Sequence, residues 1–269
     1  MDSRSDRVVA GLDVGAKNVH TVLIQEGCPV AWTTTPSGFD HRAAAEQGLE
    51  EVTRAAGVQA RDLMVIAATG AGRKALSFAA LRPTEIAADA RGATYLYPAA
   101  RLVIDVGADE ARAIRLDESG RVADFAINEK CAAGAGAFVE AMSRALEMSL
   151  NEFARVSLES TEKISMSAQC TVFAESEVVS LIHANTPPAD IARAVHDAMA
   201  SRVSALARRV GIEEPVVMGG GVALNLGFVR ALSEALGGMD LYVPLHAQYL
   251  GALGAALMAW EAALEAEET

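Results

Sequence analysis

Two stretches of the chain share one succession of apolar and polar positions. Residues 9–24 read VAGLDVGAKNVHTVLI, and residues 101–116 read RLVIDVGADEARAIRL. In each, an apolar run leads to Asp-x-Gly, polar residues follow and a second apolar run resumes, which predicts a strand, a tight turn and a returning strand. The shared Asp-Val-Gly-Ala indicates two similarly built halves, and a chance likeness between two ordinary hairpins is the alternative.

The rest of the pattern predicts helices alternating with buried strands. Helical spacing covers residues 40–56, 132–146, 172–182 and 188–209, and the segment LGALGAALMAWEAALEAEE predicts a closing helix with a solvated acidic end. Apolar runs at 63–69 and 215–218 predict strands. In the second helix, Phe138 and Met142 lie on an apolar stripe that is typical of core packing. A hinge between the halves is expected near Tyr97 and Pro98.

Composition narrows the class of protein. The chain has 269 residues, of which 51% are hydrophobic, so it can bury a sizeable core. Its formal net charge is −12 and it has no basic run with interleaved aromatics, which argues against nucleic acid and anionic membranes as partners. The N-terminus does not read as a secretory signal, and no run approaches the ~20 apolar residues of a membrane span. We therefore expect a soluble cytoplasmic protein.

The two Asp-x-Gly hairpins are candidate phosphate-binding elements. Glycine lets backbone N–H groups approach a phosphate, and the carboxylates of Asp13 and Asp105 can hold the hydrated Mg²⁺ that accompanies ATP. The run at positions 219–221, directly after a strand, offers a backbone without Cβ atoms against which adenine and ribose can lie, and Asn225 follows on the next turn. A loose turn is the alternative for the glycine run. The chain lacks the Gly-x-x-x-x-Gly-Lys-Ser/Thr of P-loop enzymes and the dinucleotide-binding Gly-x-Gly-x-x-Gly after its first strand.

Two of the three cysteines precede predicted helices. Cys131 stands immediately before AAGAGAFVEAMSRAL, and Cys170 opens CTVFAESEVVSL, so both thiolates would be stabilised by a helix N-terminus. A four-iron cluster takes four cysteines, which two copies of such a pair can supply. Their separation of 39 residues favours ordinary buried cysteines when spacing alone is considered. Cys28 is expected to be incidental in a turn, and the five histidines form no metal-ligand spacing.

Several strings together resemble one known family. GLDVGAKN, ATGAGRKAL, ARGATYLYP, VIDVGADEARAI, INEKCAAGAGAFVE, SAQCTVFAESEVVSL, VMGGGVALNLGFVRAL and LGALGAALMA span nearly the whole chain. They resemble the ATPase family that contains the activators of 2-hydroxyacyl-CoA dehydratases and the ATP-binding subunits of benzoyl-CoA reductase. The two cysteine motifs are its most specific marks. The chain departs from many relatives at Ala16-Lys17 and from the activators at Gly107-Ala108-Asp109-Glu110, where it is more similar to the ATP-binding subunit of the reductase.

The resemblance implies the actin, sugar-kinase and heat-shock-protein fold, an α/β architecture with two similar domains around a nucleotide cleft. The first domain would comprise residues 1–98 and the second 99–249, with the helix of 250–269 packing back on the first. Asp13 and Asp105 would be catalytic, and Cys131 and Cys170 would ligate a 4Fe-4S cluster shared between two subunits. The implied contacts with ATP and Mg²⁺ are Gly15, Ala16, Lys17, Gly107, Ala108, Gly134, Gly136, Gly219, Gly220, Gly221 and Asn225.

By the same resemblance, we expect an ATP-binding, iron–sulfur electron-transfer subunit of an ATP-dependent benzoyl-CoA reductase. Its partners would be a second related ATPase subunit, substrate-binding reductase subunits and a ferredoxin as electron donor. ATP-driven closure of the cleft would rotate the helices that begin at the two cysteines, with Glu140, Glu175 or Glu177 as supporting carboxylates or as solvated helix faces. The alternatives are a homodimeric dehydratase activator, a small-molecule kinase of the same fold and a nucleotide-sensing subunit without activity.

Overall fold

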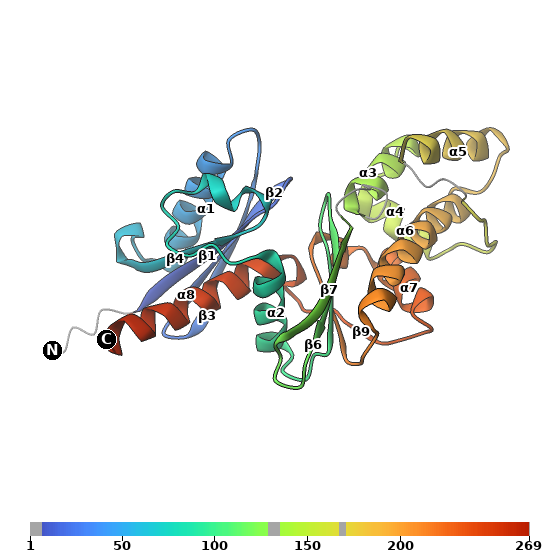
Figure 1. Ribbon diagram of the computed structural model, residues 1–269. Coiled ribbons are helices and arrows are strands. Elements are labelled where there is room, and N and C mark those ends of the chain that lie inside the picture. The colour runs from blue at the N-terminus through green and yellow to red at the C-terminus, as the bar shows by residue number, and fades with distance from the viewer. Residues whose placement is uncertain (1–6, 129–134, 167–170, 269) are drawn as a thin grey trace. The chain divides into compact units, whose positions relative to one another are not determined.

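The computed structural model describes residues 7–128, 135–166 and 171–268 (Figure 1). The chain forms two compact units. Unit 1 comprises Met1–Ala99, Asp117–Val122 and Gln248–Thr269, and unit 2 comprises Ala100–Leu116 and Ala123–Ala247. No helix in these described ranges is both long and apolar enough to cross a membrane.

Unit 1 is a four-stranded sheet with helices on both faces. The strand order is β3-β2-β1-β4, with β1 antiparallel to β2 and parallel to β4. Alternate residues of β1 face α1 on one side and α8 on the other, so nearly every residue of this strand is buried. The elements are β1 (Val8–Val14), β2 (Asn18–Gln25), β3 (Cys28–Pro36), α1 (His41–Ala56), the 3₁₀ helices η1 (Ala60–Asp62) and η2 (Ala71–Ala75), β4 (Leu63–Thr69), α2 (Glu85–Leu96) and α8 (Leu250–Glu268).

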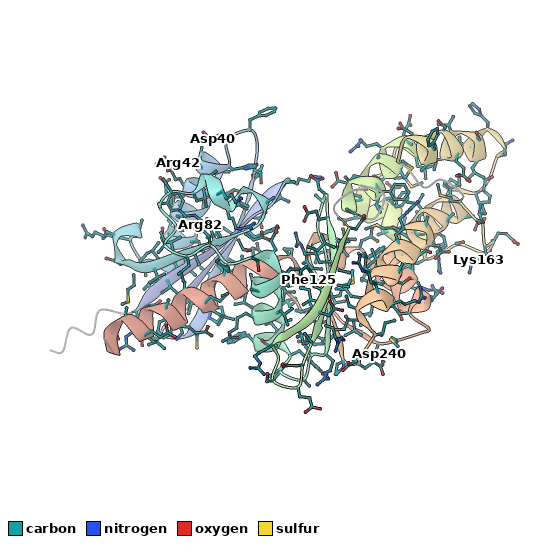
Figure 2. All side chains as sticks on the ribbon, viewed as in Figure 1. Asp40, Arg42, Arg82, Phe125, Lys163 and Asp240 are labelled. Atoms are coloured by element: carbon teal, nitrogen blue, oxygen red, sulfur yellow. The ribbon has the colours of Figure 1, made fainter. Side chains whose placement is uncertain are left out.

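Helix α8 lies close to its neighbours because small residues face them. A Cβ added at Gly11 of β1 would lie 2.1 Å from the backbone nitrogen of Ala256, and one added at Gly254 would lie 1.7 Å from the carbonyl oxygen of Ala88 in α2. Helix α1 is capped by Asp40, which accepts from the backbone nitrogens of Arg42 and Ala43; Figure 2 labels Asp40 and Arg42. The predicted helix at 40–56 and the predicted strand at 63–69 are therefore confirmed.

Unit 2 is a five-stranded sheet of order β7-β6-β5-β8-β9 with a group of helices. Strand β5 is antiparallel to β6 and parallel to β8. The predicted hairpins and the helices at 172–182 and 188–209 are confirmed within one or two residues at each end. The elements are β5 (Leu102–Val106), β6 (Ala111–Leu116), β7 (Val122–Asn128), α3 (Gly136–Ala145), α4 (Leu150–Ser157), α5 (Thr171–His183), α6 (Pro188–Val210), β8 (Val216–Gly219), η4 (Gly221–Leu224), α7 (Leu226–Ala235) and β9 (Leu241–Tyr242), with η5 (Ala247–Tyr249) at the unit boundary.

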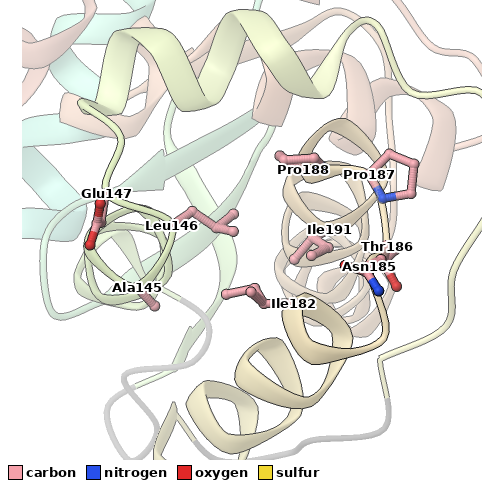
Figure 3. A pocket seen from close by; sticks show the side chains of 9 residues that line it. All are labelled: Ala145, Leu146, Glu147, Ile182, Asn185, Thr186, Pro187, Pro188 and Ile191. Atoms are coloured by element: carbon pink, nitrogen blue, oxygen red, sulfur yellow. The ribbon is translucent and has the colours of Figure 1, made fainter.

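The ends of α3 and α5 and the start of α6 border an open pocket of about 510 Å³ (Figure 3). Its walls are mostly apolar, as Leu146, Ile182 and Ile191 illustrate, and Glu147 is the one ionisable residue among those that line it. Apart from Glu147, its polar lining residues are the uncharged Asn185 and Thr186, so it offers no pair of ionisable groups for acid–base chemistry. The strand ends of the two sheets are therefore the better candidates for a functional site.

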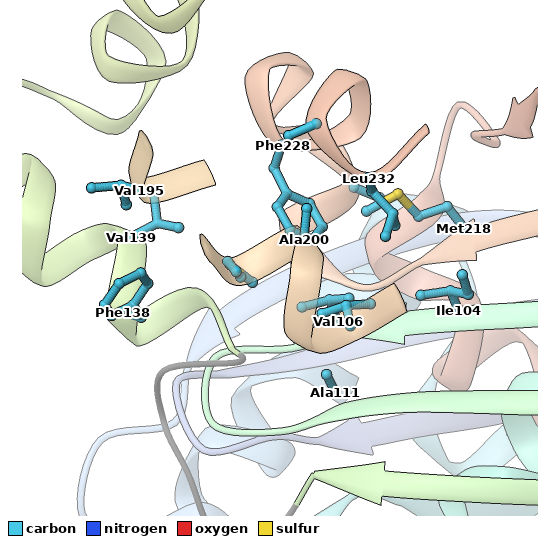
Figure 4. Close-up of a cluster of buried hydrophobic side chains, with 14 of the residues drawn as sticks. Ile104, Val106, Ala111, Phe138, Val139, Val195, Ala200, Met218, Phe228 and Leu232 are labelled. Atoms are coloured by element: carbon cyan, nitrogen blue, oxygen red, sulfur yellow. The ribbon is translucent and has the colours of Figure 1, made fainter. Parts of the chain in front are cut away.

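The core of unit 2 joins its sheet to its helices (Figure 4). Ile104 and Val106 of β5 share a buried cluster with Phe138 of α3 and Phe228 of α7. Phe138 and Met142 are fully buried, so the predicted apolar stripe is core packing as expected.

The likeness between the units extends beyond Asp-Val-Gly-Ala. In unit 1, β4 leads to Gly70, whose φ is 88°, and η2 follows; in unit 2, β8 leads to Gly220, whose φ is 81°, and η4 follows. A Cβ at Gly70 would lie 2.5 Å from the carbonyl oxygen of Val14, and one at Gly220 would lie 2.3 Å from that of Val106. Each unit thus places a glycine with positive φ against the end of the strand that leads into its hairpin.

Candidate functional site

The hairpin of unit 2 is a tight turn with a buried ion pair at its base. Gly107 N–H donates to the carbonyl oxygen of Glu110 over 2.9 Å, which closes the turn. Asp105 and Arg112 are direct partners across the two strands, and Arg112 Nη1 lies 3.0 Å from Asp105 Oδ1. Arg112 Nη2 also lies 3.0 Å from Glu110 Oε2, so one guanidinium bridges two carboxylates.

Asp105 is buried at the end of β5, with 6% of its surface exposed. Desolvation raises the pKa of this carboxyl above its usual value, Arg112 opposes that rise, and the nearby Glu110 adds to it. A carboxylate in this setting binds a cation strongly, because little water screens its charge. Such a carboxylate suits the role of the predicted Mg²⁺-binding aspartate.

The glycine run lies beside this hairpin. Gly219 ends β8 and is paired in register with Asp105, so both residues lie at the carboxyl end of adjacent parallel strands. Gly220 is glycine because its backbone touches that of Val106, whereas a Cβ at Gly221 would meet nothing within 4 Å. Of these two glycines, Gly221 is the one that leaves open space of the kind that the predicted adenine contact needs.

Both the oxygen and the nitrogen of the Asn225 side-chain amide have hydrogen-bond partners within the protein. Its Oδ1 accepts from the backbone N–H of Phe228 and caps α7, and its Nδ2 lies 3.1 Å from His196 Nε2. Because the amide nitrogen donates to Nε2, the proton of His196 is on Nδ1, which lies 3.0 Å from Ser157 Oγ. Ser157 in turn donates to the carbonyl oxygen of Ala154 over 2.7 Å. The sequence predicted a nucleotide contact at Asn225; the structure gives this side chain two internal partners.

His196 is fully buried in this chain of hydrogen bonds and packs edge-on against Phe153, with ring centroids 5.2 Å apart. Burial, with a contribution from Arg193, lowers the pKa of His196 to about 3. The imidazole is therefore neutral, and it holds the start of α7 against α4 and α6.

Gly136 joins the hairpin to α3. Its backbone nitrogen donates to the carbonyl oxygen of Gly107 over 2.9 Å, and the nitrogen of Ala137 donates to that of Ala108 over 2.8 Å. A Cβ at Gly136 would lie 2.9 Å from a methyl group of Val222 in η4. The N-terminus of α3 is thus bonded to the predicted phosphate turn and packed against the predicted adenine loop.

The hairpin of unit 1 has similar turn chemistry. Gly15 N–H donates to the carbonyl oxygen of Asn18 over 3.0 Å, and Ser37 closes the turn from outside through its hydroxyl to Gly15 and its backbone nitrogen to Lys17. Ala16 and Lys17 are exposed. A ligand at this turn can therefore reach its backbone.

Asp13, half-buried at the base of this turn, lies between two glycines. A Cβ at Gly70 would lie 2.5 Å from its Oδ1, and one at Gly251 would lie 3.2 Å from its Oδ2. The Cβ position at Gly251 would also lie 3.0 Å from Oδ1 of Asp89, a buried residue of α2. Unit 1 thus brings a second carboxylate close to the predicted aspartate.

The remaining predicted carboxylates lie on α3 and α5. Glu175 is exposed, whereas only 22% of the Glu140 side chain is exposed, and Glu140 pairs with Arg144 at 3.9 Å. Cys28 is exposed and begins β3 rather than lying in a turn, because its segment pairs with β2. Cys131, Cys170 and Gly134 lie outside the described residues. Within the described ranges, no group of three His, Cys, Asp or Glu is placed to hold a metal ion.

Three residues with partners or neighbours in these regions were not predicted from the sequence: Arg112 of β6, Asp89 of α2 and His196 of α6. The pairing of Arg112 could have been predicted, because it lies seven positions after Asp105 and the predicted hairpin brings the two residues opposite each other. Asp89 and His196 carried none, because a single polar residue within a helix reads as a solvated position.

The chain resembles known proteins along most of its length. It is 40% identical to the activator of lactoyl-CoA dehydratase from Anaerotignum propionicum, over 94% of this chain and 97% of that protein. It is 36% identical to the 2-hydroxyisocaproyl-CoA dehydratase activator of Clostridioides difficile, over 96% and 97%. It is 33% identical to one of the subunits of benzoyl-CoA reductase from Thauera aromatica, over 93% and 92%.

Solved structures agree with these likenesses. The activator of the 2-hydroxyisocaproyl-CoA dehydratase from Clostridium difficile, solved with bound ADPNP, superposes with a TM-score of 0.93 at 37% identity, covering 97% of each chain. The fold is the actin-like ATPase fold, as expected from the sequence. The match to the family runs over residues 10–259, nearly the whole chain. The protein belongs to the BadF/BadG/BcrA/BcrD ATPase family.

Proposed function

We propose that this protein is a homodimeric ATPase that activates a 2-hydroxyacyl-CoA dehydratase by passing it low-potential electrons. The observation that carries the proposal is the identity of 40% and 36% to two dehydratase activators, against 33% to the benzoyl-CoA reductase polypeptide. The expected reductase subunit becomes the second candidate. It is favoured by the hairpin sequence at positions 107–110, which resembles that subunit.

The nucleotide of this activity is ATP with Mg²⁺. ADPNP, an ATP analogue, is bound by the solved relative, and each unit here carries a glycine turn with a buried or half-buried aspartate at its base. Mg²⁺ prefers carboxylate and phosphate oxygens and keeps several waters, so Asp13 and Asp105 are suited to hold it and to orient the attacking water. The turn glycines bring backbone N–H groups toward the phosphates.

The electron carrier is a 4Fe-4S cluster held by Cys131 and Cys170 of two copies of the chain. The support within the described residues is indirect: α5 begins at Thr171, so its N-terminus follows Cys170 directly. When bound, such a cluster accepts and donates single electrons at a potential set by its surroundings. A ferredoxin is the proposed donor.

Helix α5 supports self-association. Three of its large apolar side chains, Phe173, Val179 and Ile182, expose 71%, 41% and 38% of their surfaces. Such exposed apolar side chains gain free energy when a second apolar surface covers them. A second copy that also completes the cluster would cover it.

The bonds at Gly136 support communication between nucleotide and cluster. Two backbone hydrogen bonds tie α3 to the hairpin at Gly107 and Ala108, and α3 begins five residues after Cys131. A turn that shifts on ATP hydrolysis would therefore pull on the segment that leads to the cysteine.

The test is anaerobic purification followed by analysis of mass, iron and activity. The proposal expects a brown homodimer with about four irons per dimer that hydrolyses ATP and activates a 2-hydroxyacyl-CoA dehydratase. A stable complex with a second ATPase subunit that reduces benzoyl-CoA would favour the second candidate. Iron-free protein that phosphorylates a small molecule would contradict both.

A further inference from the structure

The hairpin of unit 2 carries an excess of negative charge. Asp105, Asp109 and Glu110 give it three carboxylates, and Arg112 is the one basic residue between positions 102 and 114. A triphosphate is itself a polyanion, so these carboxylates repel it unless cations lie between them. Arg112 is the cation that the chain itself contributes.

Arg112 is held at the base of the phosphate turn, on the strand that leaves it. Only 12% of its side chain is exposed, and two of its nitrogens each lie 3.0 Å from a carboxylate oxygen, one of Asp105 and one of Glu110. The guanidinium therefore fixes both acidic side chains at the base of the turn. It stands beside the aspartate proposed to hold Mg²⁺.

A guanidinium has five N–H donors in a rigid fork that fits phosphate oxygens as well as carboxylates. Mg²⁺ that arrives with ATP can take over the neutralisation of Asp105, since it prefers the same oxygens. With Asp105 neutralised in this way, the fork would be available to donate to a phosphate oxygen beside the same ion.

We propose that Arg112 is a phosphate-binding residue of the nucleotide site: it neutralises Asp105 and Glu110 in the nucleotide-free chain and donates to a phosphate oxygen of bound ATP. This inference rests on the proposed ATPase function and names the residue that senses the phosphates. It predicts that Arg112 matters for ATP and not for the nucleoside.

The experiment is calorimetric titration of the dimer with Mg·ATP and, separately, with adenosine. R112Q should weaken Mg·ATP binding about 10- to 100-fold and change adenosine binding by less than about twofold, since a charge-assisted hydrogen bond to phosphate is lost. R112K keeps the positive charge but not the forked guanidinium, so its affinity for Mg·ATP should fall about 3- to 10-fold. The matched control is R101Q, which breaks the ion pair of Arg101 with Glu213 (2.6 Å) in the same unit and should leave both affinities unchanged.

Equal losses of affinity for Mg·ATP and adenosine in R112Q would overturn the inference, because they would show that the ion pair of Arg112 has only a structural role. Unchanged ATP affinity in R112Q would overturn it too, while leaving the proposed function in place. Wild-type protein that binds adenosine but not ATP would overturn the ATPase function and the role of Arg112 together.

Discussion

The buried histidine of unit 2 should make the protein sensitive to acid. The folded chain keeps His196 neutral down to about pH 3, whereas an unfolded chain protonates it near its ordinary pKa of 6.5. Between these values the unfolded state binds more protons, so stability is fully present above about pH 6.5 and is lost as the pH falls toward 3. Lowering the pH from about 7 to about 5 should cost about 2 kcal/mol through this one residue.

The assay is urea unfolding at both pH values, followed by circular dichroism, for wild type and H196Q. Glutamine cannot titrate, so over this pH change the free energy of unfolding of H196Q should fall by about 2 kcal/mol less than that of wild type. This holds whatever the stability of H196Q at neutral pH. His20, whose pKa burial lowers to about 4, contributes in the same direction and is present in both proteins. H183Q is the matched control, because His183 is exposed at the end of α5. Equal pH sensitivity in wild type and H196Q would refute the reasoning.

The glycines and cysteines lead to three more expected outcomes. Gly221→Ala should change stability by less than about 0.5 kcal/mol, because its Cβ meets nothing within 4 Å, yet it should weaken ATP binding; unchanged affinity would argue against an adenine contact there. Gly254→Ala should cost about 3 kcal/mol or more, since its Cβ would lie 1.7 Å from a carbonyl oxygen of α2, and a wild-type melting temperature would contradict this. Cys131→Ala should abolish bound iron and keep ATP affinity, as measured by iron analysis and titration, and retained iron would exclude Cys131 as a ligand.

Elements with strong local periodicity could be predicted from the sequence. The hairpin strands, α1, β4, α6 and α8 follow from alternation or helical spacing of apolar residues. Helix α2 was missed because its buried stripe is made of Ala88, Asp89, Gly92 and Ala93, which carry little hydrophobic signal. Those positions are buried because α8 packs on them at Gly254, a contact between segments more than 150 residues apart.

The predicted nucleotide residues stay predictions, and the structure adds the reason for each residue type. Gly220 and Gly221 look equivalent in the sequence, but one is required by the backbone of Val106 and the other faces open space. Asn225 looks like a free amide and has two internal partners. A sequence pattern cannot separate such roles, because they depend on what another strand or helix places beside the residue.

By itself, the sequence determined the two strand–turn–strand repeats, most helices and the family, because these depend on residues close together along the chain. Only the tertiary structure decided which charged groups are neighbours: Arg112 pairs with Asp105 and Glu110, and Asp89 and Asp13 both face Gly251. The physical reason is that strand register and helix packing determine which side chains become neighbours. Both depend on the burial of apolar surface over the whole unit.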